Sequence, residues 1–206
     1  MNMPANSRSC LAAAILFALP AAAMAGPLVV VDVGAPAINC VFNTTCKVVV
    51  NDTVGNIAVP GAVGTAGLQS RAFVGTAGAP ANGKNGYMYR VDLTQAVAVG
   101  NVVCVAALKL DYGPMSKFHY KTGGPLADVF VVTSGGLGNV ALASADQVGN
   151  VITFNFSAPV CPGAAPGKGD TSFFFGLAAV KAPKAITAQV QVGSSLVNVA
   201  ARAKNH

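Results

Sequence analysis

Basic and aromatic side chains alternate over one short stretch of this chain. Lys117, His119 and Lys121 are separated by Phe118 and Tyr120. Successive side chains of a β-strand point to opposite faces. In a strand this spacing would therefore gather the three basic groups on one face and turn the two rings toward a core. The stretch is therefore a candidate binding surface for an anion.

A second cation could extend this surface. Lys109 stands between leucines in an earlier stretch, and Gly113-Pro114 favours a turn between the two. If the stretches pair as a hairpin, Lys109 joins Lys117, His119 and Lys121 on one cationic face. Such a face could hold an anionic polymer, such as an acidic polysaccharide or lipopolysaccharide. Lysine on an outer strand also blunts edge-to-edge aggregation, so a purely structural role is the alternative.

Residues for nucleophilic or acid–base catalysis are scarce. The only histidines are His119 and the terminal His206, and the chain has no Gly-x-Ser-x-Gly motif. Glycoside hydrolysis usually needs two carboxylates, but the chain has no glutamate. The aspartates at expected strand ends or turns, where aspartate commonly bonds to backbone, are Asp92, Asp111, Asp128 and Asp146. We expect a protein that is not an enzyme, with an unrecognised hydrolase as the alternative.

Glycine-rich stretches and loop aspartates do not complete a phosphate or metal site. Residues 163–168 are one residue short of the phosphate-loop spacing, and residues 135–138 lie between expected strands rather than before a helix. Residues 146–150 and 168–171 could each supply one or two calcium ligands, but neither has the carboxylate ladder of a calcium loop. We therefore expect no cofactor and no metal.

Five cysteines point to two disulfides. Cys10 lies in a leader segment, which leaves Cys40, Cys46, Cys104 and Cys161. Of the three pairings, we favour Cys40 with Cys46, which would clip a short turn, and Cys104 with Cys161, which would join distant stretches. A four-cysteine metal site is the alternative, although no Cys-x-x-Cys pair is present.

Residues 1–25 have the pattern of a cleaved secretory signal peptide. Arg8 supplies positive charge, residues 11–22 are apolar, and residues 23–25 form a small-x-small cleavage site. The apolar run is too short to favour an anchor, and no later run is long enough to span a bilayer. We expect one mature domain, residues 26–206, in a secreted or periplasmic protein of bacterial type with no membrane span after cleavage.

The mature chain reads as a series of short strands separated by glycine and proline. Residues 87–93 give the clearest alternation, and residues 127–161 read as two consecutive hairpins, whereas residues 59–67 and 75–86 read as loops. The expected strands cover residues 28–33, 47–54, 68–74, 87–93, 102–112, 116–121, 128–134, 140–144, 151–157, 171–180 and 185–192, and residues 196–199 are a candidate last edge strand. About eleven strands without a credible helix predict an all-β, antiparallel two-sheet sandwich of immunoglobulin-like or jelly-roll type.

These features predict a class of function rather than a reaction. The formal net charge is +6, a mild positive balance that fits simple solubility as well as adhesion. We expect a non-enzymatic structural or surface-binding module of the cell envelope or extracellular space. Its partner would be a second copy of the chain or another envelope protein, through exposed strand edges. The alternative is binding of an anionic surface polymer through the lysine-rich face. Exposed aromatic platforms for bases are lacking, so no nucleic-acid partner is expected.

Overall fold

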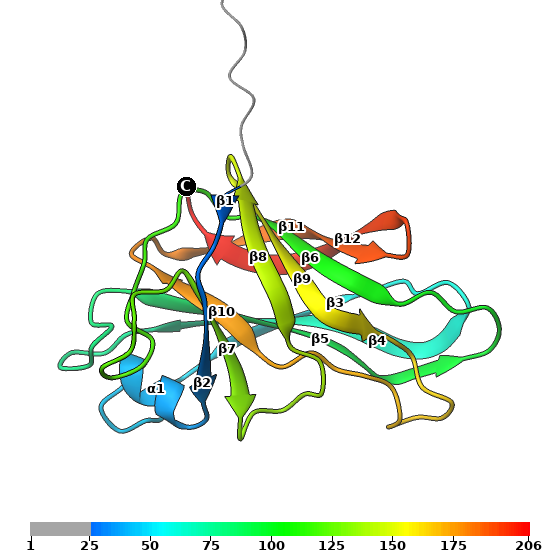
Figure 1. Ribbon diagram of the computed structural model, residues 1–206, viewed down its shortest axis with the longest axis horizontal. Helices are drawn as coiled ribbons and strands as arrows, with labels where there is room; N and C mark the ends of the chain where they lie inside the picture. The colour runs from blue at the N-terminus through cyan, green and yellow to red at the C-terminus, as the bar shows by residue number, and fades with distance from the viewer. Residues whose placement is uncertain (1–25) are drawn as a thin grey trace, which may run out of the picture.

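The computed structural model describes residues 26–206, and the predicted signal peptide lies outside the described residues. Its strands form two six-stranded sheets, so the predicted all-β, two-sheet architecture is confirmed (Figure 1). The strands are β1 (Gly26–Pro27), β2 (Val30–Gly34), β3 (Asn51–Asn56), β4 (Ala62–Val74), β5 (Asn85–Ala98), β6 (Val105–Asp111), β7 (Val129–Ser134), β8 (Leu142–Val148), β9 (Val151–Val160), β10 (Phe175–Ala179), β11 (Pro183–Val192) and β12 (Ser195–Lys204). One short helix, α1 (Ala37–Phe42), follows β2.

The first sheet has the order β1-β8-β9-β6-β11-β12, and the second has the order β2-β7-β10-β5-β4-β3. All neighbouring strands are antiparallel except β2 and β7, which are parallel. The N-terminal segment joins both sheets, because β1 pairs with β8 and β2 pairs with β7 (Figure 1). Between these pairings, Asp128 Oδ2 accepts a 2.8 Å hydrogen bond from the backbone N–H of Val29.

The main core lies between the sheets. The alternation predicted for residues 87–93 is confirmed in β5, where Tyr87, Tyr89, Val91 and Leu93 are fully buried. Rings from both sheets meet here; the Phe154 and Phe175 centroids are 4.9 Å apart. Strict alternation in the strands therefore produces the buried layer that holds the sheets together.

A second buried cluster lies on the opposite face of the second sheet. Met88 of β5 and Phe130 of β7 alternate with main-core residues, so their side chains point away from the first sheet. Helix α1 and residues from loops cover them. This outer cluster comprises Val33, Ile38, Val41, Phe42, Phe73, Ala81, Met88, Tyr120, Ala127, Phe130, Val132, Phe174 and Ala178.

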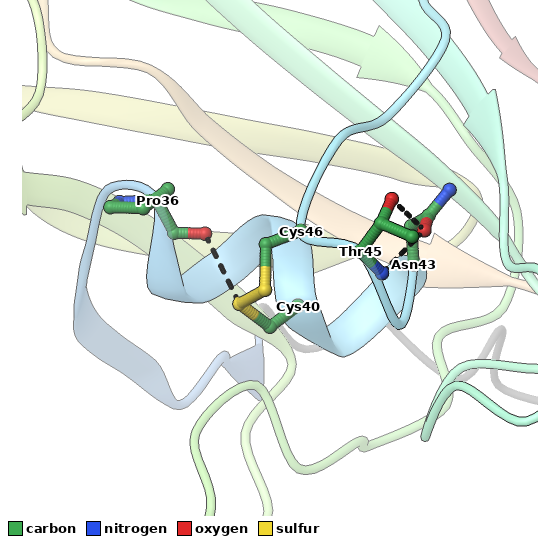
Figure 2. The surroundings of a disulfide bond; sticks show 5 residues. All are labelled: Pro36, Cys40, Asn43, Thr45 and Cys46. Atoms are coloured by element: carbon green, nitrogen blue, oxygen red, sulfur yellow. Dashed lines mark hydrogen bonds between the residues drawn. A yellow bond between two sulfur atoms is a disulfide. The ribbon is translucent and has the colours of Figure 1, made fainter.

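Both predicted disulfides are present. Cys104–Cys161 links the ends of the paired strands β6 and β9. Cys40–Cys46 clips the chain that leaves α1, and Asn43 Oδ1 accepts hydrogen bonds of 2.8 Å from the N–H and hydroxyl of Thr45 in the same turn (Figure 2). The two disulfides indicate an oxidising environment, extracellular or periplasmic.

Three local predictions were wrong. Residues 62–67, expected to be a loop, belong to β4. The first predicted hairpin of residues 127–161 does not form, because β7 and β8 lie in different sheets; only β8 and β9 pair. Strand β7 has apolar side chains on both faces. Its position between β2 and β10 in the second sheet buries both of these faces. Residues 116–121 are not a strand; their one bridge joins Phe118 to Ala127.

The C-terminal hairpin fixes the position of the end of the chain. Strands β11 and β12 pair along their whole length, from Val192 opposite Ser195 at the turn to Pro183 opposite Lys204 at the far end. The side of the sandwich next to β12 is closed by bonds from the second sheet: Arg202 N–H donates to Ser70 Oγ at 2.9 Å, and Tyr89 OH donates to Arg202 O at 2.6 Å. This register brings Lys204 beside the β10–β11 turn. Within residues 26–206, no helix is both long and apolar enough to cross a bilayer.

Candidate functional site

Four lysines from separate parts of the chain line one hollow of about 150 Å³. Lys84 precedes β5, Lys117 lies in the loop between β6 and β7, Lys181 lies in the β10–β11 turn, and Lys204 ends β12. We call this hollow the lysine pocket; its lining comprises Lys84, Pro114, Ser116, Lys117, Phe118, Ala178, Ala179, Val180, Lys181 and Lys204. None of the seven aspartates lines it.

Lys204 forms the buried side of the lysine pocket. It is 8% exposed, and its Nζ donates a hydrogen bond to the carbonyl oxygen of Pro114. The same Nζ lies 5.3 Å from the centroid of the Tyr112 ring. Burial lowers the pKa of the Lys204 ammonium, and the neighbouring charge of Lys181 lowers it further.

Hydrogen bonds hold the turn that carries Lys181. Its carbonyl oxygen accepts bonds from Tyr87 OH at 2.6 Å and from Asn85 Nδ2 at 3.1 Å. On another wall, Lys84 Nζ lies 5.4 Å from the Phe118 ring centroid, a cation–π arrangement. The pocket is therefore built on the ends of β5 and β12, with exposed lysines at the rim.

The pocket has an uncompensated positive charge. Within residues 26–206, the ion pairs join Arg71 to Asp52, Arg90 to Asp92 and His206 to Asp111, and none involves a lysine. Like charges around a small hollow repel one another, and an anion placed among them removes that cost. Carboxylate, sulfate and phosphate groups can all accept hydrogen bonds from ammonium donors.

Only one member of the predicted cationic face lies in this pocket. Strand β6 pairs with β9 and β11, not with residues 116–121, so the predicted hairpin is wrong. Lys109 lies on the outer face of the first sheet, whereas Lys117 lines the lysine pocket. His119 is exposed, with Nδ1 2.8 Å from Gly124 O, and Lys121 lines an apolar hollow beside α1.

The sequence analysis missed three of the four pocket lysines. Lys84, Lys181 and Lys204 are isolated from one another in sequence, and no short motif contains any two of them. Each stands at the end of a strand or in a turn, which is where side chains from different segments can meet. The residue types offered no further signal.

The candidate catalytic and calcium-binding aspartates have structural partners. Asp92 Oδ1 accepts bonds from the N–H and hydroxyl of Thr94, and Asp146 Oδ2 accepts one from Asn155. Asp170 accepts bonds from the N–H of Cys161 and the side chain of Asn139. In the part of the chain that the structure describes, no three His, Cys, Asp or Glu side chains gather as metal ligands would.

A second hollow, of about 240 Å³, lies over β3, β4 and β5 on the outer face of the second sheet. Its charges are paired with each other, since Arg90 Nη2 lies 3.0 Å from Asp92 Oδ2. Arg90 also stacks 4.9 Å from the centroid of the Phe174 ring. The Arg90 and Asp92 charges offset one another, so this hollow has less free charge to offer a ligand than the lysine pocket.

No protein-family model, curated protein or solved structure matches this chain. Its function is therefore inferred from the geometry of these sites.

Proposed function

We propose that this protein is an exported, non-enzymatic β-sandwich that binds anionic groups of a surface polymer in the lysine pocket. The observation that carries the proposal is the convergence of Lys84, Lys117, Lys181 and Lys204 on one hollow whose lining includes no carboxylate. Export is supported by the leader pattern of residues 1–25 and by the two disulfides. Its place of action would be the cell envelope or the extracellular space of a bacterium.

The size of the hollow favours a group on a larger molecule. About 150 Å³ is smaller than the roughly 300–1,000 Å³ of sites that enclose a drug-sized ligand. A carboxylate, sulfate or phosphate would fit, while the rest of its polymer lies across the exposed Lys117 and Lys181. Attraction of this kind is screened by salt, so binding should weaken as ionic strength rises.

Retention on immobilised heparin, a sulfated polysaccharide, tests the proposal. We expect the purified chain 26–206 to be retained at low salt and not retained on uncharged dextran. Lys117→Ala with Lys181→Ala should raise the dissociation constant for heparin roughly tenfold, since each exposed ion pair contributes up to about 1 kcal/mol.

A matched double variant separates the pocket from overall charge. Lys109→Ala with Lys121→Ala removes the same charge at two predicted-face positions that lie outside the lysine pocket. This variant should keep nearly all of the heparin affinity. Equal losses in the two double variants would contradict a pocket-centred site, and a larger loss in this one would favour the originally predicted lysines.

Self-association through the edge of β3 is a second candidate function. Among residues 26–206, β3 forms a backbone pairing only with β4, although β12 packs against it. A sheet edge of this kind can accept a strand from a second copy. Beside this edge, Val49 and Val54 are 90% and 62% exposed. Sedimentation over a range of concentrations should show dimers that Val49→Lys with Val54→Lys abolishes; a monomer at every concentration would remove this candidate.

A further inference from the structure

Lys204 is the only buried cationic side chain among residues 26–206. A buried ammonium normally needs an opposite charge, yet Lys204 has a carbonyl and an aromatic ring as its partners. Its charged neighbours in the pocket lining are lysines. The Lys204 amine therefore lies in a largely desolvated position beside other cations.

The surroundings of Lys204 make its ammonium group easier to deprotonate than that of an exposed lysine. Desolvation and the charge of Lys181 both lower the pKa of Lys204, so more of it is neutral near pH 7 than of an exposed lysine. A neutral amine can donate one N–H to Pro114 O and still present its lone pair to an electrophile. Desolvated lysines beside other cations are known nucleophiles toward carbonyl carbon.

We propose that Lys204 is a covalent attachment site for small aldehydes that carry an anionic group. Lys84, Lys117 and Lys181 line the same hollow and would hold the carboxylate or phosphate of the aldehyde near the amine. This recruitment step rests on the anion-binding role proposed above. The class of ligand follows from the pairing of one buried amine with three cations around it.

The chemistry needs no oxidant, metal or cofactor. The Lys204 amine adds to the aldehyde carbon, and a proton moves from nitrogen to oxygen to give a carbinolamine. Loss of one water molecule then forms the C=N bond of an imine, so that amine and aldehyde together yield imine and water. The step is reversible, and the attachment would therefore follow the local concentration of aldehyde.

Reductive labelling of the unmodified protein tests the proposal without a variant that must fold. The chain 26–206, with its disulfides intact, is treated at neutral pH with limiting glyoxylate and cyanoborohydride, which converts an imine into a stable carboxymethyl-lysine. Peptide mass spectrometry then gives the labelling rate at each lysine. We expect Lys204 to be labelled at least roughly tenfold faster than the exposed Lys168.

Acetaldehyde, a neutral aldehyde, supplies the control for anion recruitment. The preference for Lys204 over Lys168 should be smaller with acetaldehyde than with glyoxylate. Lys117→Ala with Lys181→Ala should shrink that difference, because it slows labelling at Lys204 more with glyoxylate than with acetaldehyde. Loss of the Lys181 charge slows labelling with both aldehydes, since it lets the pKa of Lys204 rise. Labelling of Lys204 at or below the rate of Lys168, or the same preference with both aldehydes, would overturn the proposal.

The labelling experiment and the heparin experiment can fail independently of each other. If heparin retention depends on the pocket but Lys204 is not preferentially labelled, the covalent site is wrong and the polymer-binding function stands. If glyoxylate labels Lys204 preferentially while the pocket variant keeps its heparin affinity, the covalent site stands and polymer binding is wrong.

Discussion

The two buried clusters of this protein are built in different ways. In the main core, strands of both sheets contribute alternating side chains, and the layer is regular on each side. In the outer cluster, only one side is a sheet; the other is α1 and loop residues such as Ala81 and Tyr120. The irregular cover also contributes to the candidate site, because Phe118 packs against the outer cluster and lines the lysine pocket. The main core thus holds the sheets together, whereas the cover of the outer cluster positions ligand-binding groups.

Alkaline pH should disrupt both clusters, which is the largest effect we expect. Burial raises the pKa of Tyr87, Tyr89 and Tyr112 in the main core and of Tyr120 in the outer cluster. An unfolded tyrosine ionises near pH 10, so above that pH the unfolded chain releases protons that the folded chain retains. Stability is therefore full below about pH 10 and falls as pH rises beyond it.

Tyrosinate absorbance and circular dichroism, followed together, check this and test whether the clusters are one cooperative unit. All four tyrosines should ionise in a single transition that coincides with loss of strand signal. Ionisation of one tyrosine before unfolding, absent from the Tyr120→Phe variant, would show that the outer cluster opens separately.

Phe175→Ala should destabilise the protein by roughly 4 kcal/mol in denaturant titrations. Phe175 is fully buried and its ring packs against those of Tyr89, Phe154 and Phe156. The matched change in the outer cluster is Phe42→Ala, which removes an equally buried ring that meets Phe73 edge-on at 4.8 Å. That variant should lower the free energy of unfolding by about 3 kcal/mol, since an irregular cover can collapse into the cavity more easily than two sheets can. A larger loss at Phe42 would mean that the cover is as rigid as the sandwich.

The same contrast explains how far the sequence could predict the structure. Strand β5 places Tyr87, Tyr89, Val91 and Leu93 on one face by strict alternation. In a two-sheet sandwich that face is buried whatever the order of the strands. Lys117 to Lys121 show a similar alternation but form a loop, because Tyr120 is buried by the outer cluster rather than by strand pairing. Local periodicity cannot distinguish these two ways of burying a ring.

The lysine pocket could not be predicted for a related reason. Lys181 and Lys204 meet because β11 and β12 pair in one register, and Lys84 and Lys117 join them through tertiary packing. The disulfides, in contrast, were predictable, since four cysteines allow few pairings and the leader pattern of residues 1–25 predicts an oxidising compartment.

Removal of the short disulfide should lower the free energy of unfolding by less than Phe175→Ala does. Cys40→Ala with Cys46→Ala should lower stability by about 2 kcal/mol, because the bond closes a loop of only 6 residues. Hydrogen exchange should increase mainly in α1 and the loop that follows it. The matched variant, Cys104→Ala with Cys161→Ala, opens a separation of 57 residues in the first sheet and should cost roughly 4 kcal/mol. Equal losses would argue against the chain-entropy account of both bonds.

The smallest effect we expect comes from single hydroxyl groups. Tyr120 OH accepts a 2.8 Å hydrogen bond from Ala178 N–H and donates to Asp128 O at 3.3 Å, so it joins the loop to β10. Tyr120→Phe should therefore cost about 1 kcal/mol or slightly more, because it leaves a buried N–H without its partner. The hydroxyl of Tyr112 is buried and has no hydrogen-bond partner among residues 26–206, so Tyr112→Phe should leave stability unchanged or raise it slightly. Thermal unfolding of the two variants measures the difference. Its reversal would mean that the main core depends on polar contacts and the outer cluster does not.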